Sequence, residues 1–239
     1  ARAKGQLDSH PFGTELDVYS DEYEWLAHSM APNAQAPSDW RVDVGSRQCT
    51  RPYSASLLNI SAMSFGSLSA NAIMALNKGA AAGNFYHDTG EGGISRYHRS
   101  HGGDLVWEIG SGYFGCRTED GAFDPDRFAE SARGEQVKMV EIKLSQGAKP
   151  GHGGVLPGSK VTEEIAAARG VPVGSDCISP PAHSTFSTPI QMLEWAAQLR
   201  ELSGGKPVGI KLCVGKPHEV FALMKAMRET GITLDYIVV

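Results

Sequence analysis

The chain has 239 residues, of which 41% are hydrophobic and 21% charged, and this composition argues against disorder and for one large globular domain. A formal net charge of −5 gives no basic field that would attract nucleic acid, so we expect a small-molecule partner. The four cysteines form no C-x-x-C pair, which argues against a disulfide framework or a zinc knuckle and favours a cytoplasmic location. No run of about 18 apolar residues occurs, so no membrane-spanning segment is expected.

The first 55 residues predict an irregular N-terminal arm that packs on the domain after it. Segment 31–45 is rich in proline, asparagine, serine and aspartate, which is typical of a loop. Segment 22–30 has enough apolar periodicity to predict one short helix.

From residue 56 to residue 239, short apolar runs alternate with helical patterns, which predicts a parallel α/β sheet or barrel. The expected strands are 57–62, 83–87, 137–144, 208–213 and 234–239, and the expected helices are 70–82, 162–168, 189–203 and 218–230.

Two observations favour a barrel. Glycine-rich or polar segments follow the strands, at the carboxyl ends where barrel enzymes build their sites. No G-x-G-x-x-G motif follows an early strand, so a dinucleotide-binding fold lacks its best signature. A complete eight-unit barrel needs about 250 residues. We therefore expect the chain to hold the first part of a barrel and to stop within a strand at Val239.

Six segments that follow one another along the chain carry a resemblance to a known family. They are NISAMSFGSLS (59–69), DTGEGG (88–93), GSGYFGCR (110–117), IKLSQGAKPGHGGVLPGSKV (142–161), ISPPAHSTF (178–186) and GIKL (209–212). Together with GTELDVYSDEYEWLAHSMAP (13–32), they are similar to the FMN-binding synthase domain of glutamate synthases, and in particular to stand-alone FMN-binding glutamate synthase family proteins. The resemblance implies a TIM-type (β/α)8 barrel of the FMN-linked oxidoreductase kind.

The resemblance also implies which residues hold the cofactor. The main chain of Ala62, Met63 and Ser64 would lie beside FMN, and the lysines Lys143 and Lys211 would reach it. Lys211 needs a partner on physical grounds as well, because a lysine on an apolar strand is almost never buried unpaired.

The catalytic residues implied by the resemblance are Glu91, Lys143 and Gln146. Glu91 would place one carboxylate in the mouth of the site, for positioning or proton handling. Cations there suit both a dianionic keto acid and a reduced flavin. The implied substrate contacts are Ser145, Gln146, Lys149 and Arg169.

The implied reaction is hydride transfer from reduced FMN to 2-iminoglutarate, formed from 2-oxoglutarate and ammonia, which gives L-glutamate. Such an oxidoreductase acts on a CH–NH2 group in glutamate biosynthesis, and it implies an electron-donor or amidotransferase partner. The family's glycine-rich phosphate loop and any iron–sulfur cluster would lie beyond Val239. We therefore expect the chain as given to bind FMN poorly or not at all.

Three other functions stay open. The chain could be a non-catalytic half-barrel scaffold that docks with a partner chain, since an open edge of a parallel sheet must be covered. It could be a related FMN enzyme that acts on an N-methylated amino acid. A different FMN barrel enzyme, such as an isomerase or a nucleotide dehydrogenase, fits the SQGAKPGHGG segment less well.

Several residues favour a structural interpretation over a chemical one. His98, His101 and Asp104 have the spacing of metal ligands, but no helix places a third ligand, so we expect surface or loop hydrogen bonds and no metal. Cys116 could be a reactive thiol, but a buried structural cysteine is more common, so its role stays open. His183 in ISPPAH is a candidate for lining the site.

Overall fold

A computed structural model describes residues 17, 19–21, 23–24, 30–31, 40–144 and 153–239. The chain divides into two units, Ala1–Ser38 and Asp39–Val239. In the first unit, the amide of Tyr23 donates to the Ser20 carbonyl at 3.2 Å. Most of the helix expected at 22–30 lies outside the described residues.

The second unit begins with an antiparallel hairpin of β1 (Arg41–Val44) and β2 (Tyr53–Ser56), in which Val44 lies opposite Tyr53. The expected loop at 31–45 is therefore wrong for residues 41–44, because this short segment becomes a strand through its partner. The strand expected at 57–62 is also wrong, since only a single bridge between Ile60 and His87 forms there.

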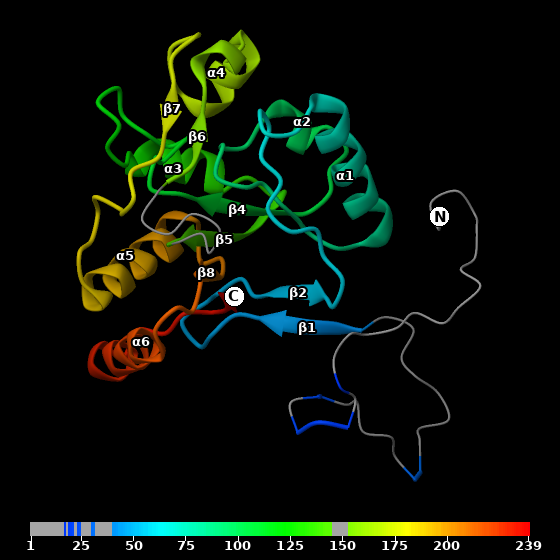
Figure 1. The fold of residues 1–239 in the computed structure, drawn as a ribbon, viewed down its shortest axis with the longest axis vertical. Helices are drawn as coiled ribbons and strands as arrows, with labels where there is room; N and C mark the ends of the chain where they lie inside the picture. The colour runs from blue at the N-terminus through cyan, green and yellow to red at the C-terminus, as the bar shows by residue number, and fades with distance from the viewer. Residues whose placement is uncertain (1–16, 18, 22, 25–29, 32–39, 145–152) are drawn as a thin grey trace. The chain divides into compact units, whose positions relative to one another are not determined.

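The centre of the second unit is a curled parallel sheet of five strands (Figure 1). In spatial order they are β3 (His87–Asp88), β4 (Leu105–Ile109), β5 (Val137–Lys143), β8 (Val208–Lys211) and β9 (Ile237–Val238). Each strand pairs in parallel with its neighbour. Spatial order follows chain order, with helices between most strands, as in the first part of a (β/α) barrel. The structure confirms the parallel α/β prediction and shows a half-barrel.

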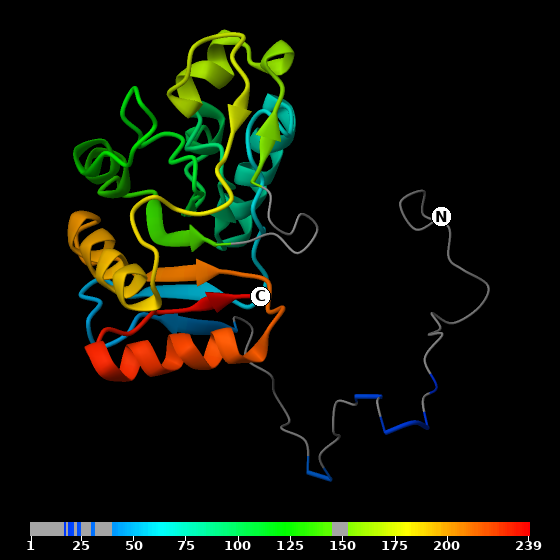
Figure 2. The ribbon, with the colours of Figure 1, turned by 60° about the vertical axis from the view of Figure 1, so that its left-hand side comes forward.

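Helices connect the strands. The four expected helices are confirmed as α1 (Ala70–Gly83), α4 (Glu163–Arg169), α5 (Pro189–Leu202) and α6 (Pro217–Thr230), and two unexpected ones are α2 (Arg96–Arg99) and α3 (Pro125–Ala132). The start of α3 is set by Asp124, whose side chain accepts from two backbone amides, followed by a proline. Figure 2 shows α5 and α6 on the same side of the sheet. None of the described helices is long and apolar enough to cross a membrane.

An insertion separates β5 from α5. It contains β6 (Val155–Leu156), the 3-10 turn η2 (Gly158–Lys160), α4 and β7 (Cys177–Ile178), and its two strands pair antiparallel. Ile165 of α4 packs with Phe65 and Phe114 in a buried apolar cluster. This cluster joins the insertion to the loops that follow the first strands of the sheet.

The two faces of the sheet differ, because side chains alternate along each strand. The outer face is apolar, and its buried residues Trp107 and Ile210 pack in one cluster with Leu199 of α5. On the inner face, Tyr53 of the hairpin packs in a second cluster with Met139. The hairpin therefore covers the amino-terminal half of the inner face, and the carboxyl-terminal half carries charged residues.

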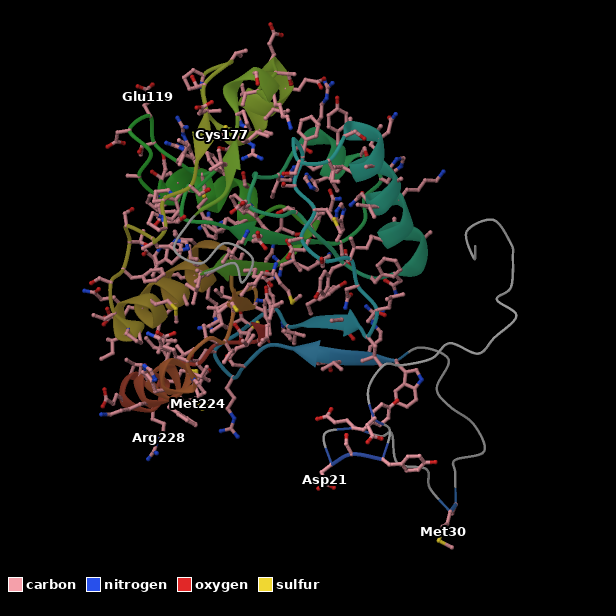
Figure 3. All side chains as sticks on the ribbon, in the orientation of Figure 1. Asp21, Met30, Glu119, Cys177, Met224 and Arg228 are labelled. Carbon is pink, nitrogen blue, oxygen red and sulfur yellow. The ribbon has the colours of Figure 1, made fainter. Side chains whose placement is uncertain are left out.

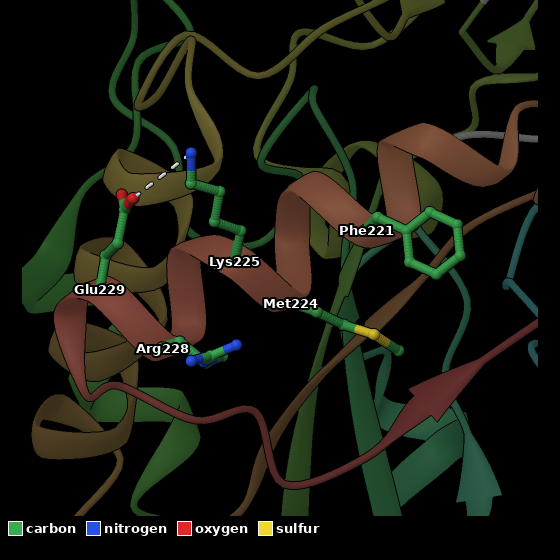
Figure 4. Close-up of a pocket in the computed structure, with 5 residues that line it drawn as sticks. All are labelled: Phe221, Met224, Lys225, Arg228 and Glu229. Carbon is green, nitrogen blue, oxygen red and sulfur yellow. Dashed lines mark ion pairs between the residues drawn. The ribbon is translucent and has the colours of Figure 1, made fainter.

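Helix α6 has an exposed apolar stripe. Phe221 and Met224 are 66% and 48% exposed, and Figure 3 shows Met224 projecting from the outer surface of this helix. These two residues line a hollow of about 570 Å³ together with Lys225, Arg228 and Glu229 (Figure 4). Lys225 and Glu229 form an ion pair, in which Nζ lies 3.7 Å from Oε1. This hollow holds none of the residues at the strands' carboxyl ends.

Candidate active site

Three carboxylates from three neighbouring strands surround the ammonium group of Lys211 on the inner face of the sheet. Its Nζ lies 3.2 Å from Asp88 Oδ2 and 2.5 Å from Glu141 Oε1, and it also bonds the carboxylate of Glu108. The register explains this meeting, because Glu108 of β4 pairs directly with Glu141 of β5. The expectation that Lys211 has a partner is confirmed.

The sequence prediction missed these three carboxylates. Glu108 and Glu141 are 1% and 2% exposed, and each interrupts an apolar strand, in LVWEI and in VKMVEIK. That is the same signal that singled out Lys211, since charged residues are almost never fully buried unless paired. Their charges convert the inner face of the half-barrel into a polar cluster.

Burial and mutual repulsion change the protonation of the carboxylates. Burial, reinforced by the charge of Glu141, raises the pKa of Asp88 to about 7. Burial also raises the pKa values of Glu108 and Glu141. Burial alone would lower the pKa of Lys211, but the three carboxylates outweigh it and raise that pKa. Three acids around one ammonium therefore retain a proton close to neutral pH.

A second lysine ends β5 beside this cluster. Lys143 lies opposite Lys211 in the register, with its Nζ 3.1 Å from Glu91 Oε2 and 3.8 Å from Glu108 Oε1. Glu91 comes from the loop after β3, and a side chain at Gly154 would collide with its carboxylate. The structure thus brings the predicted residues Glu91, Lys143 and Lys211 together, and Glu108 links the two lysines.

The predicted cofactor segment 62–64 lies against the loop that carries Glu91. The amide of Met63 donates to the carbonyl of Asp88 at 3.1 Å. Gly90 has φ of +66°, and a Cβ there would approach the Ser64 amide nitrogen to 2.8 Å. A glycine is needed at this position for both reasons.

Arg169 is the buried last residue of α4, with an exposure of 4%. Its guanidinium carbon lies 5.1 Å from the centre of the Phe114 ring, and a side chain at Gly92 would meet it. Burial lowers its pKa, and the charge of Glu91 acts in the opposite direction. Arg169 therefore lies behind the loop of Glu91. The predicted residues Ser145, Gln146 and Lys149 fall outside the described residues.

His183 packs beside the second lysine. Its Nε2 bonds the carbonyl oxygen of Lys143 at 2.8 Å, and its ring stacks on Phe186. Both aromatic residues line an apolar recess of about 390 Å³ with Leu144 and Met192. His183 therefore contacts the main chain of Lys143, and its role in lining the site stays a prediction.

Cys116 and His98 are both buried, and His98 differs from the expected surface or loop position because it lies in helix α2. Burial raises the pKa of Cys116, which keeps this thiol protonated. His98 is buried and makes hydrogen bonds to Ser95 and to the Met63 carbonyl.

A curled parallel sheet with charged residues at the carboxyl ends of its strands defines an α/β protein with a half-barrel sheet. The profile described as "Conserved region in glutamate synthase" matches residues 29–238, which is most of the chain. The chain belongs to the glutamate synthase family.

Relatives of known name support this placement. The chain is 42% identical over 237 residues to the glutamate synthase large subunit-like protein YerD of Bacillus subtilis (strain 168), covering 98% of this chain and 45% of that protein. It is 35% identical over 179 residues to the archaeal-type glutamate synthase (NADPH) of Thermotoga neapolitana, covering 74% of this chain and 32% of that protein. It is 37% identical over 174 residues to the archaeal glutamate synthase (NADPH) of Archaeoglobus fulgidus, covering 72% and 31%. The chain spans less than half the length of these relatives.

Proposed function

We propose that this chain forms part of an FMN-dependent oxidoreductase of glutamate synthase type. The observation that carries the proposal is the meeting of Lys143 and Lys211 at the carboxyl ends of paired strands, joined by Glu108 and faced by Glu91. When bound, FMN supplies the hydride that reduces 2-iminoglutarate, formed from 2-oxoglutarate and ammonia, to L-glutamate.

The described residues fit the ring end of a flavin. The side chains of Lys143 and Lys211 are 14% and 19% exposed, so a ligand in the mouth can reach them. The main chain of residues 62–64 lies beside the end of β3, where the Met63 amide donates to the Asp88 carbonyl, and the amide of Ser64 is proposed to face the flavin. The proton that the carboxylate cluster retains removes one negative charge from this position. These residues would hold the ring, and a cation there favours a reduced, anionic flavin.

The substrate side is proposed to be built around Glu91 and Lys143. The ion pair orients both groups, and Glu91 can hold or release a proton next to the substrate nitrogen. Ser145, Gln146 and Lys149 are proposed to bind the substrate carboxylates. Arg169 adds positive charge from behind the loop of Glu91.

The rest of the reaction is proposed to depend on other protein parts. Electrons and ammonia would come from an electron-donor partner and an amidotransferase, and any iron–sulfur cluster would follow Val239. The names of the archaeal-type relatives include NADPH, and we extend that electron source to this chain as a proposal.

The test uses the natural protein that contains this chain, purified with excess FMN. A bound-flavin absorption spectrum is expected. Under anaerobic conditions, the reduced flavin is expected to be reoxidised only when 2-oxoglutarate and ammonium are both present, with glutamate as product. Methylamine in place of ammonium tests the N-methylated alternative. Loss of all flavin on purification would overturn the proposal.

The half-barrel scaffold is a second candidate, favoured by the exposed Phe221 and Met224 on α6. A scaffold of this kind would retain no flavin, and a partner chain would protect these two residues. The same absorption spectrum therefore separates the two functions.

A further inference from the structure

His98 connects helix α2 to the segment proposed to face the flavin. The side chain is fully buried, and its Nε2 lies 3.0 Å from the carbonyl oxygen of Met63. Helix α2 follows the DTGEGG loop directly, so this contact joins the loop of Glu91 to residues 62–64.

The hydrogen bonds of His98 determine which ring nitrogen carries the proton. Nδ1 lies 3.1 Å from the backbone amide of Ser95, which can only donate, and 2.8 Å from the Ser95 hydroxyl, which can donate as well, so Nδ1 is an acceptor. The hydrogen is therefore on Nε2, which donates to the Met63 carbonyl. Burial lowers the pKa of His98, which keeps the ring neutral. Its neighbour His87, 5.3 Å away between ring centres, is neutral as well, because burial lowers its pKa to about 4.

The contact with Met63 sets the direction of the next amide. The Met63 carbonyl and the Ser64 N–H belong to one planar trans peptide unit, in which they point in opposite directions. Among the described residues, the Ser64 N–H has no hydrogen-bond acceptor. A side chain at Gly90 would cover its nitrogen, and glycine leaves it open. An open, oriented amide is what a flavin ring edge requires.

We propose that His98 is a positioning residue that holds the Met63 peptide so that the Ser64 amide faces the flavin. The identity of the ligand, FMN, rests on the proposed function. The hydrogen bond between His98 and Met63 does not depend on that function. The two peptides that flank Met63 are each held by one hydrogen bond: the Met63 N–H donates to the Asp88 carbonyl, and the Met63 carbonyl accepts from His98. The loss of the His98 donor frees the carbonyl side.

A matched pair of variants separates positioning from packing. In His98→Gln the side-chain amide can occupy the Nε2 position and still donate to Met63. In His98→Asn the amide occupies the Nδ1 position, so the bond to Met63 is lost. Arg99→Gln, at an exposed position of the same helix, is the control. All three are made in the natural protein, and flavin fluorescence quenching measures FMN binding.

The expected result is about tenfold weaker FMN binding in His98→Asn, the effect of one lost hydrogen bond, and a change below about threefold in His98→Gln. Hydrogen exchange of the peptide 59–69 is expected to be faster in His98→Asn alone, with or without FMN. Equal exchange in the Asn and Gln variants overturns the inference. Absence of FMN binding by the unmodified protein defeats the proposed function, and the exchange comparison still decides the role of His98.

A third measurement needs no variant. Nitrogen-15 spectra of the histidine rings are expected to show His98 with its proton on Nε2. A proton on Nδ1 excludes donation to Met63 and ends the proposal, even if both variants fail to fold.

Discussion

The carboxylate of Glu108 lies between two lysines, with Oε1 3.8 Å from Lys143 Nζ and the other oxygen bonded to Lys211. Glu108 is 1% exposed, so this link is shielded from solvent. The inner cluster and the mouth of the site are therefore one electrostatic unit, and a change at one lysine affects the other.

Replacing Glu91 with Gln tests proton handling at the mouth. We expect glutamate formation to fall about 100-fold, the usual contribution of a general acid or base, while FMN affinity changes less than about threefold. Single-turnover reoxidation of the reduced flavin measures the first quantity, and fluorescence titration measures the second. Glu119→Gln, in an exposed turn, serves as the matched control. Unchanged reoxidation in Glu91→Gln assigns the proton to another group.

Replacing Lys211 with Met removes the cation that three buried carboxylates share, and among the described residues only Glu108 of the three still has a lysine nearby, Lys143 at 3.8 Å. The free energy of unfolding is expected to fall by about 3–5 kcal/mol, as for other broken buried ion pairs. The loss should be larger at pH 8 than at pH 5, because protonation of the carboxylates relieves their repulsion. Urea unfolding at both pH values checks this. Lys225→Met on the exposed face of α6 is the control. A similarly small loss of stability in both variants would contradict the stabilising role of Lys211 in the carboxylate cluster.

The protonation of Asp88 predicts a pH dependence of stability. Its pKa is about 7 when folded and 3.8 in a model compound, so the folded state binds the proton more tightly. The group therefore stabilises the fold at low pH, and that stability is lost as the pH rises from about 4 to 7. Asp88→Asn mimics the protonated acid and does not titrate. Between pH 5 and pH 8, the free energy of unfolding of the variant should therefore rise by about 1 kcal/mol or more relative to that of the unmodified protein. Parallel urea unfolding profiles across this range would refute the assignment.

The outer face of the sheet predicts a simple difference in packing. Leu199 of α5 is fully buried, so Leu199→Ala is expected to lower the free energy of unfolding by about 2–5 kcal/mol. Ile190 on the same helix is 39% exposed. Ile190→Ala should therefore lower the free energy of unfolding by less than about half as much as Leu199→Ala does. Urea titration of both variants measures this, and equal costs would show that α5 packs with a different face.

The sequence predicted the long helices and the longest strand well, because apolar spacing in α1, α5 and α6 and in β5 is a local property. It missed β4, where Glu108 interrupts the apolar run, and it assigned β1 to a loop. A four-residue strand such as Arg41–Val44 is stabilised by its partner β2, which lies beyond any local window. The sequence alone therefore did not predict these short strands, which depend on pairing with other strands.

The same limit applies to the site. The resemblance brought forward Glu91, Lys143 and Lys211, and the structure brings these three together. The need of Lys211 for a partner was predicted from burial alone. Its three partners were not, because they depend on the register between strands, which the sequence of one strand does not reveal. The hydrogen bond from His98 to Met63 likewise joins segments that are distant in the chain.

The ring of carboxylates around Lys211 also acts on the alignment of the sheet. A slip of β8 by one residue would turn Lys211 toward the apolar helix layer and place Ile210 among three buried acids. Both changes leave charges uncompensated, so the misaligned sheet is strongly disfavoured. The pairing of Lys211 with the three carboxylates is therefore possible in one register of β8 only. The residues proposed for chemistry thus also help to specify the fold that brings them together.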